Sequence, residues 1–498
     1  MYGVCIRKKC KTLQAKRIVF IIHLSKGESF MTGKRKRKLA MPDTLIIVAS
    51  VVLLVAILSW IIPSGTYDYQ EMNINGRIRN VAIDGTYHTI DKSEVTTTGF
   101  LGFFSVLYRG CVEAADVIFM ILCCCGTFGV VVKTGAFHAG IGTILKKLKG
   151  KEILLVPIIM MIFGLGGSVF GMASEFYGFY PLIVGLGVAL GYDAMFGFAI
   201  IAVGEFVGFM GATLNPYSVG IAQTISGVEL YSGTGYRAIC FVIFMAISII
   251  YVMIYGRKIK KNPGASVVFG EKNIHAFDRD ELNEYSFTLK DGLVLLDVLV
   301  VLVVLMLGLI KWGWDFPQLC GLFLLMSMIA AAICKWSPNK WCSEFIDSAK
   351  TAMWGCILTG IAKAITVVMQ DAQIMDTVIY GLSNVLKNAP HAVSAQVMLV
   401  VQTLINFFIP SATGQASATM PIMAQLADII GVSRQAAVLA FQFGDGLSNI
   451  FWPTADIVII CGLGGISLQK WYKWFTPLFL ILFVTQAILL GIATGIGF

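Results

Sequence analysis

Charged side chains are scarce in this sequence. Asp, Glu, Lys and Arg make up only 13% of its 498 residues, whereas soluble domains average about 25%. Hydrophobic residues make up 57% instead, and the mean hydropathy is +0.79. This composition excludes an ordinary water-soluble domain.

Motifs of ATP, metal and nucleophile chemistry are missing as well. No phosphate-binding loop of the form G-x-x-x-x-G-K-[ST] occurs, which indicates that ATP does not drive this protein. The 12 cysteines show no C-x2-C pair followed by a second pair, and the five histidines suggest no catalytic cluster. We therefore expect no enzyme, no cofactor, no disulfide framework and no metal beyond a coupling Na⁺.

Apolar runs of membrane-spanning length recur from end to end, most clearly at residues 44–62, 290–310 and 473–496. Strands of outer-membrane barrels alternate in polarity instead. The sequence therefore predicts an all-α polytopic membrane protein. We expect about nine full crossings, of which seven are plain helices and two are broken ones. The plain helices are expected at about 44–62, 115–133, 236–255, 290–310, 317–334, 351–369 and 473–496.

Positive charge is concentrated at the start of the chain. Residues 1–40 contain 12 Lys and Arg and one acid, a net charge of +11, so the remainder of a chain with net charge +9 carries −2. The positive-inside rule makes this segment a cytoplasmic arm and places the protein in the cytoplasmic membrane. We favour this interpretation over nucleic-acid binding, and Met31 is an alternative start.

Two regions, 152–230 and 393–464, do not look like ordinary spans. Each has an apolar arm, a Gly- and Ser-rich tip, a second short arm and a helix interrupted near Pro. At an offset of 240 residues, Pro181 matches Pro421 and Gly204-Glu205 matches Gly444-Asp445. The matching Pro and Gly positions support a repeat, because these residues occur where the backbone bends. The alternative is coincidental Gly-rich helix packing.

The pattern predicts two inverted repeats, each with a re-entrant hairpin and a broken helix. We expect the hairpins at about 152–190 and 393–430, and the broken helices at about 194–230 and 434–464. The stretch "PSATGQASAT" would be a non-helical hairpin tip lining a cavity. The expected domains are the arm 1–40, the first repeat 41–256, a cytoplasmic linker and connecting helix 257–312, and the second repeat 313–498.

Four stretches are similar to the YfcC-like branch of the C4-dicarboxylate anaerobic carrier (DcuC) family. They read "MPDTLIIVASVVLLVAILSWIIPSGTYDY", "GATLNPYSVGIAQTISGVELYSGTGYR", "INFFIPSATGQASATMPIMAQLAD" and "RQAAVLAFQFGDGLSNIFWPT". The resemblance implies inverted repeats, a homodimer and an elevator-type moving domain. It also implies exchange of basic amino acids or transport of carboxylates.

The first tip departs from the family pattern. Where the pattern usually has "GM-x-EE-T-x-P-FYP", this chain has "GMASEFYGFYP", with Ser174 in place of the first Glu and Gly178 in place of Pro. Glu175 remains as the only acid of that tip, whereas Gln415 of the second tip is neutral. We therefore expect an asymmetric site with its charge selection on the first repeat.

Polar residues at the tips and breaks form the candidate site. An acid at membrane depth is costly, which indicates a functional role, and short amide or hydroxyl side chains are suitable ligands for Na⁺. The plainer alternative is that they face water or satisfy broken backbone. The expected substrate-binding residues are Glu175, Ser174, Asn215, Ser411, Thr413, Gln415, Asn449 and Thr454. The expected coupling-ion residues are Glu205, Asp445, Thr213 and Ser448.

These features predict a secondary active transporter that moves a small amino-acid-like solute or a carboxylate, by exchange or by Na⁺ or H⁺ coupling. The excess of acids favours a solute with an amino or guanidinium group. Its expected partners are that solute, membrane lipid and a second copy of the chain, and no nucleic acid. A C4-dicarboxylate or other organic-anion carrier is the first alternative. An ion channel with re-entrant loops is the second, and the asymmetric tips disfavour it.

Overall fold

The computed structural model describes residues 44–74, 77–148, 152–271, 275, 287–387 and 393–498. The basic arm predicted at 1–40 lies outside these residues. The long helices are α2 (Thr44–Ile61), α3 (Phe100–Glu113), α4 (Ala115–Lys133), α8 (Ala194–Met210), α10 (Thr234–Lys261), α12 (Leu289–Lys311), α13 (Phe316–Ile333), α15 (Met353–Asp371), α17 (Ser394–Phe408), α18 (Ala412–Ile429), α19 (Arg434–Ser448) and α21 (Leu468–Gly495). The shorter helices are α5 (Ala136–Leu148), α6 (Leu155–Leu165), α7 (Phe179–Ala189), α9 (Val219–Ile225), α14 (Pro338–Lys350), α16 (Met375–Lys387) and α20 (Ile457–Gly464).

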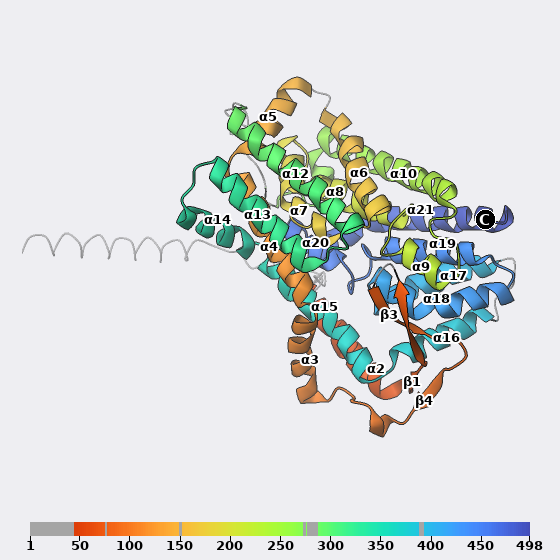
Figure 1. Ribbon diagram of the computed structural model, residues 1–498. Coiled ribbons are helices and arrows are strands. Elements are labelled where there is room, and N and C mark those ends of the chain that lie inside the picture. The colour runs from red at the N-terminus through yellow and green to blue at the C-terminus, as the bar shows by residue number, and fades with distance from the viewer. Residues whose placement is uncertain (1–43, 75–76, 149–151, 272–274, 276–286, 388–392) are drawn as a thin grey trace, which may run out of the picture. The chain divides into compact units, whose positions relative to one another are not determined.

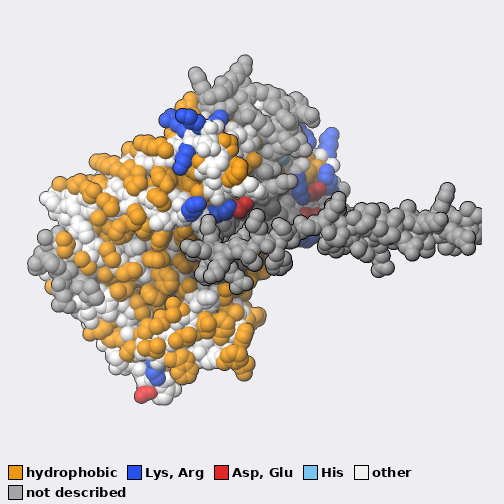
Figure 2. Space-filling model, turned by 180° about the vertical axis from the view of Figure 1, so that it is seen from behind, with side chains coloured by type: hydrophobic (Ala, Val, Ile, Leu, Met, Phe, Trp, Pro, Cys, Tyr) orange, Lys and Arg blue, Asp and Glu red, His pale blue; other side chains and the backbone are white. Residues whose placement is uncertain are grey.

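Seven helices of the described part are long and apolar enough to cross a membrane: α2, α4, α10, α12, α13, α15 and α21. The sequence predicted each of them within a few residues, so the prediction of a helical polytopic membrane protein is confirmed. Their outward side chains are mostly aliphatic or aromatic, as at Leu54, Leu299 and Val484. Figure 2 shows the result on one face, where hydrophobic side chains cover a broad area and Lys and Arg gather toward its top. Lipid is the solvent that suits such a surface.

The polar segment between α2 and α3 contains four short strands that the sequence analysis did not anticipate. β1 (Ser64–Thr66) pairs antiparallel with β4 (His88–Ile90), and β2 (Tyr69–Ile74) pairs antiparallel with β3 (Arg77–Ala82), with Tyr69 opposite Ala82. Two-stranded sheets are marginal by themselves. These sheets are stabilised by contacts with helices, since β1 packs on α16 and β3 packs on α18 (Figure 1).

Asp376 anchors this strand segment to α16. Its carboxylate accepts hydrogen bonds from the backbone N–H of Tyr67 at 3.1 Å, the Tyr69 hydroxyl at 2.8 Å and the Thr66 hydroxyl at 3.2 Å. Burial, and then the charge of Asp376, raise the pKa of Tyr69 above its usual range, so the phenol keeps the proton that it donates. Tyr87 stacks on Tyr380 beside this cluster.

The helices divide into two packing groups. In the first, α15 packs against α2, α3 and α4, and α4 packs against α13 and α14. In the second, α6, α7 and α10 pack on α8, while α17, α18 and α21 pack on α19. Within the second group α8 and α19 also pack on each other, and α20 packs on α15 of the first group.

Candidate functional site

The first predicted tip is an irregular turn between α6 and α7. α6 continues into a π-helical turn at Gly166–Phe170, Gly171 then adopts a left-handed conformation with φ of 69°, and a 3₁₀ turn follows at Ser174–Phe176. Gly171 is needed there for its positive φ and for space, since an added Cβ would lie 2.3 Å from Oδ1 of Asn215. Ser174 is half-buried. Glu175 is buried, and its Oε2 accepts the backbone N–H of Ala173 at 3.0 Å.

This tip is joined to the break that follows α8. The backbone carbonyl of Ser168 accepts the N–H of Thr213 at 2.9 Å. The Ser168 hydroxyl donates to the carbonyl of Gly211 at 3.0 Å. The side chain of Asn215 accepts the backbone N–H groups of Tyr217 and Ser218 and so caps the interrupted segment. α8 ends at Met210, and Pro216, which has no N–H, lies within the interrupted segment that follows.

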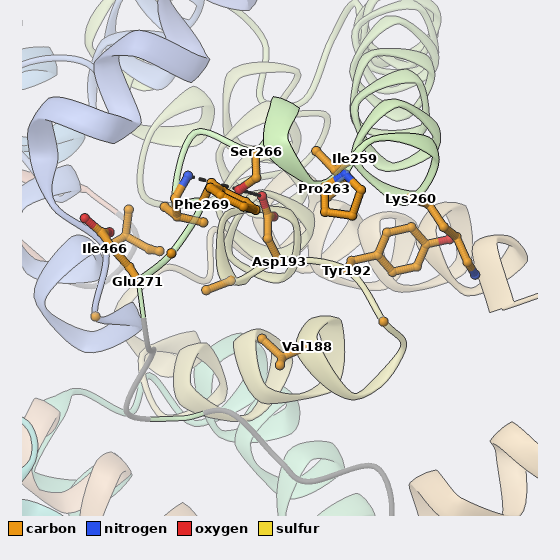
Figure 3. A pocket seen from close by; sticks show the side chains of 15 residues that line it. Val188, Tyr192, Asp193, Ile259, Lys260, Pro263, Ser266, Phe269, Glu271 and Ile466 are labelled. Carbon is orange, nitrogen blue, oxygen red and sulfur yellow. Dashed lines mark hydrogen bonds between the residues drawn. The ribbon is translucent and has the colours of Figure 1, made fainter.

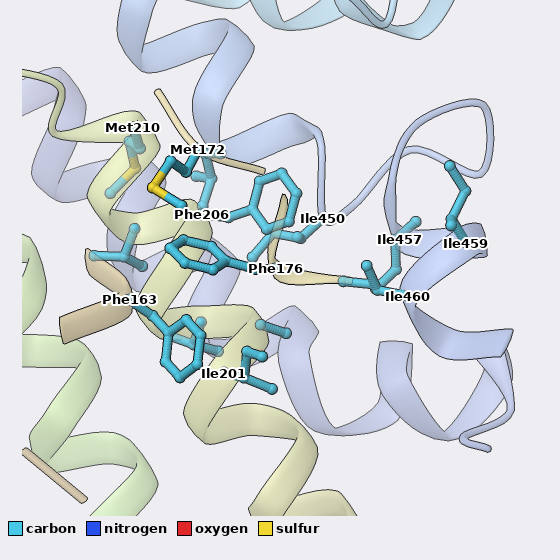
Figure 4. Close-up of a cluster of buried hydrophobic side chains, with 14 of the residues drawn as sticks. Phe163, Met172, Phe176, Ile201, Phe206, Met210, Ile450, Ile457, Ile459 and Ile460 are labelled. Atoms are coloured by element: carbon cyan, nitrogen blue, oxygen red, sulfur yellow. The ribbon is translucent and has the colours of Figure 1, made fainter. Parts of the chain in front are cut away.

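Phe176 extends the tip into the hydrophobic core. Figure 4 shows its ring between α8, represented by Phe206 and Ile201, and residues of the second broken helix such as Ile450 and Ile457. Its ring centroid is 4.8 Å from that of Phe163 on α6. The tip is therefore held by apolar packing as well as by hydrogen bonds.

The second predicted tip is more helical than expected. We predicted non-helical backbone over "PSATGQASAT", but only Ile409–Ser411 are irregular and α18 already begins at Ala412. The reason is local: the Ser411 side chain caps the helix by accepting the backbone N–H of Gly414. Pro421 then lies inside α18 rather than at its start. The prediction that this whole stretch is non-helical is wrong.

Glu205 and Asp445 occupy matching places in α8 and α19. Both are fully buried. Oε2 of Glu205 accepts the Tyr180 hydroxyl of α7 at 2.8 Å, and Oδ1 of Asp445 accepts the Asn406 amide of α17 at 2.8 Å. The second oxygen of each carboxylate has no hydrogen-bond partner in the described part of the chain.

The break after α19 carries further groups of this kind. Asn449 and Thr454 are buried, and their Oδ1 and Oγ1 atoms lack hydrogen-bond partners among the described residues. The Ser448 hydroxyl, in contrast, donates to the carbonyl of Gly444 within its own helix. The hydroxyl of Thr213, another predicted ion ligand, likewise contacts Ser168. Both hydroxyls are thus already hydrogen-bonded within the chain.

Irregular segments from the two halves of the chain exchange hydrogen bonds. The Tyr177 hydroxyl of the first tip donates to Asp456 after the second break at 2.8 Å. The Thr413 hydroxyl of the second tip donates to the carbonyl of Tyr217 after the first break at 2.9 Å. Tips and breaks that are 279 and 196 residues apart in sequence are therefore joined in a polar region.

The remaining predicted residues lie at the margins of this region. Ser411 is exposed. Gln415 of α18 is fully buried. Its amide donates to Gln402 and accepts from Asn406, both of α17, so its hydrogen bonds join the two helices. No group of three or more His, Cys, Asp or Glu side chains in the described ranges could hold a metal ion.

Comparison with known proteins places the chain in a family. Residues 41–495 match the model of the C4-dicarboxylate anaerobic carrier, DcuC, family. The chain belongs to this family. The resemblance predicted from the sequence is thus confirmed, and membership makes the chain a multi-pass membrane carrier.

Two relatives of this carrier align over nearly their whole length. YfcC of Escherichia coli (strain K12), provisionally named a basic amino acid antiporter, is 32% identical over 94% of this chain and 99% of its own. An uncharacterized protein of Haemophilus influenzae (strain ATCC 51907 / DSM 11121 / KW20 / Rd) is 27% identical over 93% and 99%.

Two solved structures also align. The YdaH transporter of Alcanivorax borkumensis has a TM-score of 0.43 at 14% identity and covers 92% of this chain and 99% of its own. MtrF of Neisseria gonorrhoeae, described with a class of antimetabolite efflux pumps, has a TM-score of 0.42 at 16% identity and covers 91% and 95%.

The sequence analysis missed several members of the polar region of this carrier. Tyr177 and Tyr180 were not selected because a Tyr beside apolar residues usually packs. Their hydroxyls donate to different carboxylates, those of Asp456 and Glu205. Asn406 and Gln402 were not selected because they lie inside an apolar helix, although buried amides need partners.

A cavity of about 500 Å³ lies away from this region, at the turn between α7 and α8. Figure 3 shows its polar group: Ser266 points to Asp193, with the aliphatic Val188 and Ile466 around them. Oδ2 of Asp193 accepts the hydroxyls of Ser266 at 2.6 Å and Tyr255 at 2.5 Å, and its Oδ1 caps α8 through Phe196 N–H. These bonds occupy the carboxylate, so it stabilises the turn.

Proposed function

We propose that this carrier is a secondary active transporter with one solute site per chain, formed where both tips and both breaks meet. The observation that carries the proposal is the reciprocal pair of hydrogen bonds, Tyr177 to Asp456 and Thr413 to Tyr217. Irregular backbone and polar groups are tolerated within a membrane only where protein or a water-filled cavity covers them. Broken helices that meet at the interface of two repeats are the usual setting of a transported solute.

The proposed topology has nine crossings and two re-entrant hairpins. The seven long apolar helices supply seven crossings, and the broken helices α8–α9 and α19–α20 supply two more. The arms α6 and α7, with 11 residues each, are too short to cross separately. Both arms pack on α8 as α17 and α18 pack on α19, which supports an inverted repeat.

The proposed solute is amino-acid-like and cationic. Glu175, Glu205, Asp445 and Asp456 supply carboxylates around the polar region, and none of their side-chain hydrogen bonds in the described chain comes from Lys or Arg. The name of the E. coli relative agrees with such a solute. A C4-dicarboxylate is the second candidate, favoured by the family description.

Glu205 and Asp445 are the proposed coupling residues. Each carboxylate keeps one oxygen without a hydrogen-bond partner in the described residues, which suits a proton or a Na⁺ ion. The neighbouring Asn449 and Thr454 would contribute neutral oxygens to the solute or the ion. Exchange without a coupling ion is the alternative mode.

We further propose that the two packing groups move relative to each other in an elevator-type cycle. The group built on α8 and α19 contains all tips and breaks, and the group built on α15 and α4 contains none. The homodimer that the family resemblance implies would be built on the group of α15 and α4. Both statements rest on the resemblance and on this division.

Counterflow in proteoliposomes tests the proposal. Vesicles loaded with unlabelled arginine, lysine or ornithine should accumulate the labelled solute, because exchange requires a carrier. Acceleration by succinate or fumarate alone would establish the second candidate. Labelled flux that is insensitive to every internal solute, together with ionic conductance, would refute a carrier. Asp445→Asn provides the loss-of-function control.

A further inference from the structure

Arg237 is a buried cation outside the proposed solute site. It is the fourth residue of α10, and only 1% of its surface is exposed. Arginine is almost never fully buried without a partner, because an uncompensated charge in a low dielectric is strongly destabilising. The surroundings of this side chain therefore need explanation.

The guanidinium has few partners among the described residues. Its Nη2 donates to Oε1 of Gln435 at 3.4 Å, and its Cζ lies 5.9 Å from the ring centroid of Phe498. Nε and Nη1 have no hydrogen-bond partner, and no described carboxylate forms an ion pair with this side chain. A neutral amide and an aromatic face do not neutralise a guanidinium.

The adjacent helix ends add to the positive potential. α10 begins at Thr234 after Gly233, which provides no side-chain cap. The first N–H groups of the helix therefore carry the positive end of the helix dipole without a capping acceptor. Gln435 is the second residue of α19, so the start of a second helix lies beside the same guanidinium. There the Ser433 side chain accepts the N–H of Ala436 and donates to the main-chain oxygen of Phe498. A cation is disfavoured at helix N-termini, whereas an anion is stabilised there.

We propose that Arg237 and the starts of α10 and α19 bind a small monovalent anion, such as chloride or a short carboxylate. Nε and Nη1 would donate charge-assisted hydrogen bonds to it. Packing at the start of α10 is tight, since an added Cβ at Gly233 would lie 2.6 Å from Nε2 of Gln435 and 2.6 Å from the Phe498 ring. Such packing leaves no room for a larger solute at this point.

An anion at this position would also link neighbouring helices through Gln435. Gln435 also accepts from the Gln223 amide of α9 at 3.1 Å and donates to the Ser232 hydroxyl at 2.9 Å. The anion would therefore connect the second half of one broken helix with the start of the other. It stabilises this end of the transporter, and its binding does not depend on which solute is carried.

Thermal unfolding of the full chain in neutral detergent, without phospholipid, tests the site. Replacing sodium gluconate by sodium chloride at constant ionic strength should raise the Tm by about 2–5 °C in a saturable manner. Arg237→Met should abolish this response. Arg109→Met is the matched control, since Arg109 lies on α3, is paired with Asp371 and should leave the response intact.

Several results would overturn the site. These are an equal Tm in chloride and gluconate, a chloride response that survives in Arg237→Met, and stabilisation only by an anionic phospholipid. An acetate arm separates chloride from short carboxylates, and a response to either supports the site. Should Arg237→Met fail to fold, anomalous diffraction from bromide-soaked wild-type crystals decides: bromide within hydrogen-bond distance of Nε or Nη1 supports the site, and its absence there refutes it.

Discussion

Glu175 illustrates, at the scale of a residue, how burial and hydrogen bonding define a functional candidate. It is the only acid in the first tip, it is 7% exposed, and its Oε2 accepts a backbone N–H. A buried acid in a membrane protein is expensive, so its retention argues for a role in binding charge. Glu205 and Asp445 follow the same logic from the centres of two helices.

Glu175→Gln should reduce transport by roughly tenfold or more while expression and Tm stay near wild type, because Gln keeps the shape but removes the charge that the site offers to a solute or ion. The measurement is initial uptake in proteoliposomes. Glu229→Gln, an exposed acid between α9 and α10, is the control. Transport near the wild-type rate in Glu175→Gln would remove this residue from the site.

At the scale of elements, close glycine contacts hold α6 and the turn that follows it against α8. Gly208 of α8 faces Gly164 of α6, and an added Cβ at Gly208 would lie 2.0 Å from the Gly164 carbonyl oxygen. Gly167 makes a similar approach to α8, where an added Cβ would lie 2.5 Å from the carbonyl oxygen of Glu205. The geometry of the tip is therefore set by backbone contact as much as by its own hydrogen bonds.

Gly208→Ala should separate α6 from α8, with a destabilisation of about 1–3 kcal/mol, and should lower transport. Thermal unfolding and uptake measure the two effects. The control is Gly321→Ala in α13, where an added Cβ meets nothing within 4 Å. An unchanged Tm for Gly208→Ala would show that these helices are free to move apart.

The two tips should differ in their accessibility to water. Ser411 is exposed at the start of α18, whereas Ser168 is fully buried and hydrogen-bonded to the chain beyond α8. In a cysteine-free background, a membrane-impermeant thiol reagent should therefore label Ser411→Cys quickly and Ser168→Cys at least about tenfold more slowly. Equal labelling of the two variants would contradict the packing of the first tip.

At the scale of the whole molecule, the two packing groups meet where α20 packs on α15 and where α4 packs on α7 and the first tip. At the contact of α15 with α20, an added Cβ at Gly462 would lie 3.3 Å from the Cα of Gly355. An elevator-type cycle requires such contacts to slide. A fixed interface would instead keep them through every step.

Cross-linking distinguishes these two cases. Cysteines introduced together at Gly355 and Gly462 are close enough for a disulfide, and its formation should abolish transport until a reductant restores it. The measurement is counterflow before and after reduction, and each single cysteine variant serves as the control. Full activity in the oxidised double variant would show that the two groups do not move apart during transport.

The sequence by itself determined the class of the protein and the limits of its helices. Apolar runs of about 20 residues have few alternatives to membrane-spanning helices, since backbone groups must be satisfied within each segment. The breaks near Pro216 and Pro453 were predictable for a similar local reason, because proline ends a hydrogen-bonded helix. Family membership followed from the same stretches.

Only the tertiary structure decided which polar groups meet. Tyr177 reaches Asp456, and Thr413 reaches the backbone of Tyr217, across about 200 residues or more of intervening chain. The cap at Ser411 made the second tip helical, although its composition suggested a loop. Such contacts depend on how α8 and α19 pack together, and helix packing is set by side-chain fit across the interface rather than by local sequence.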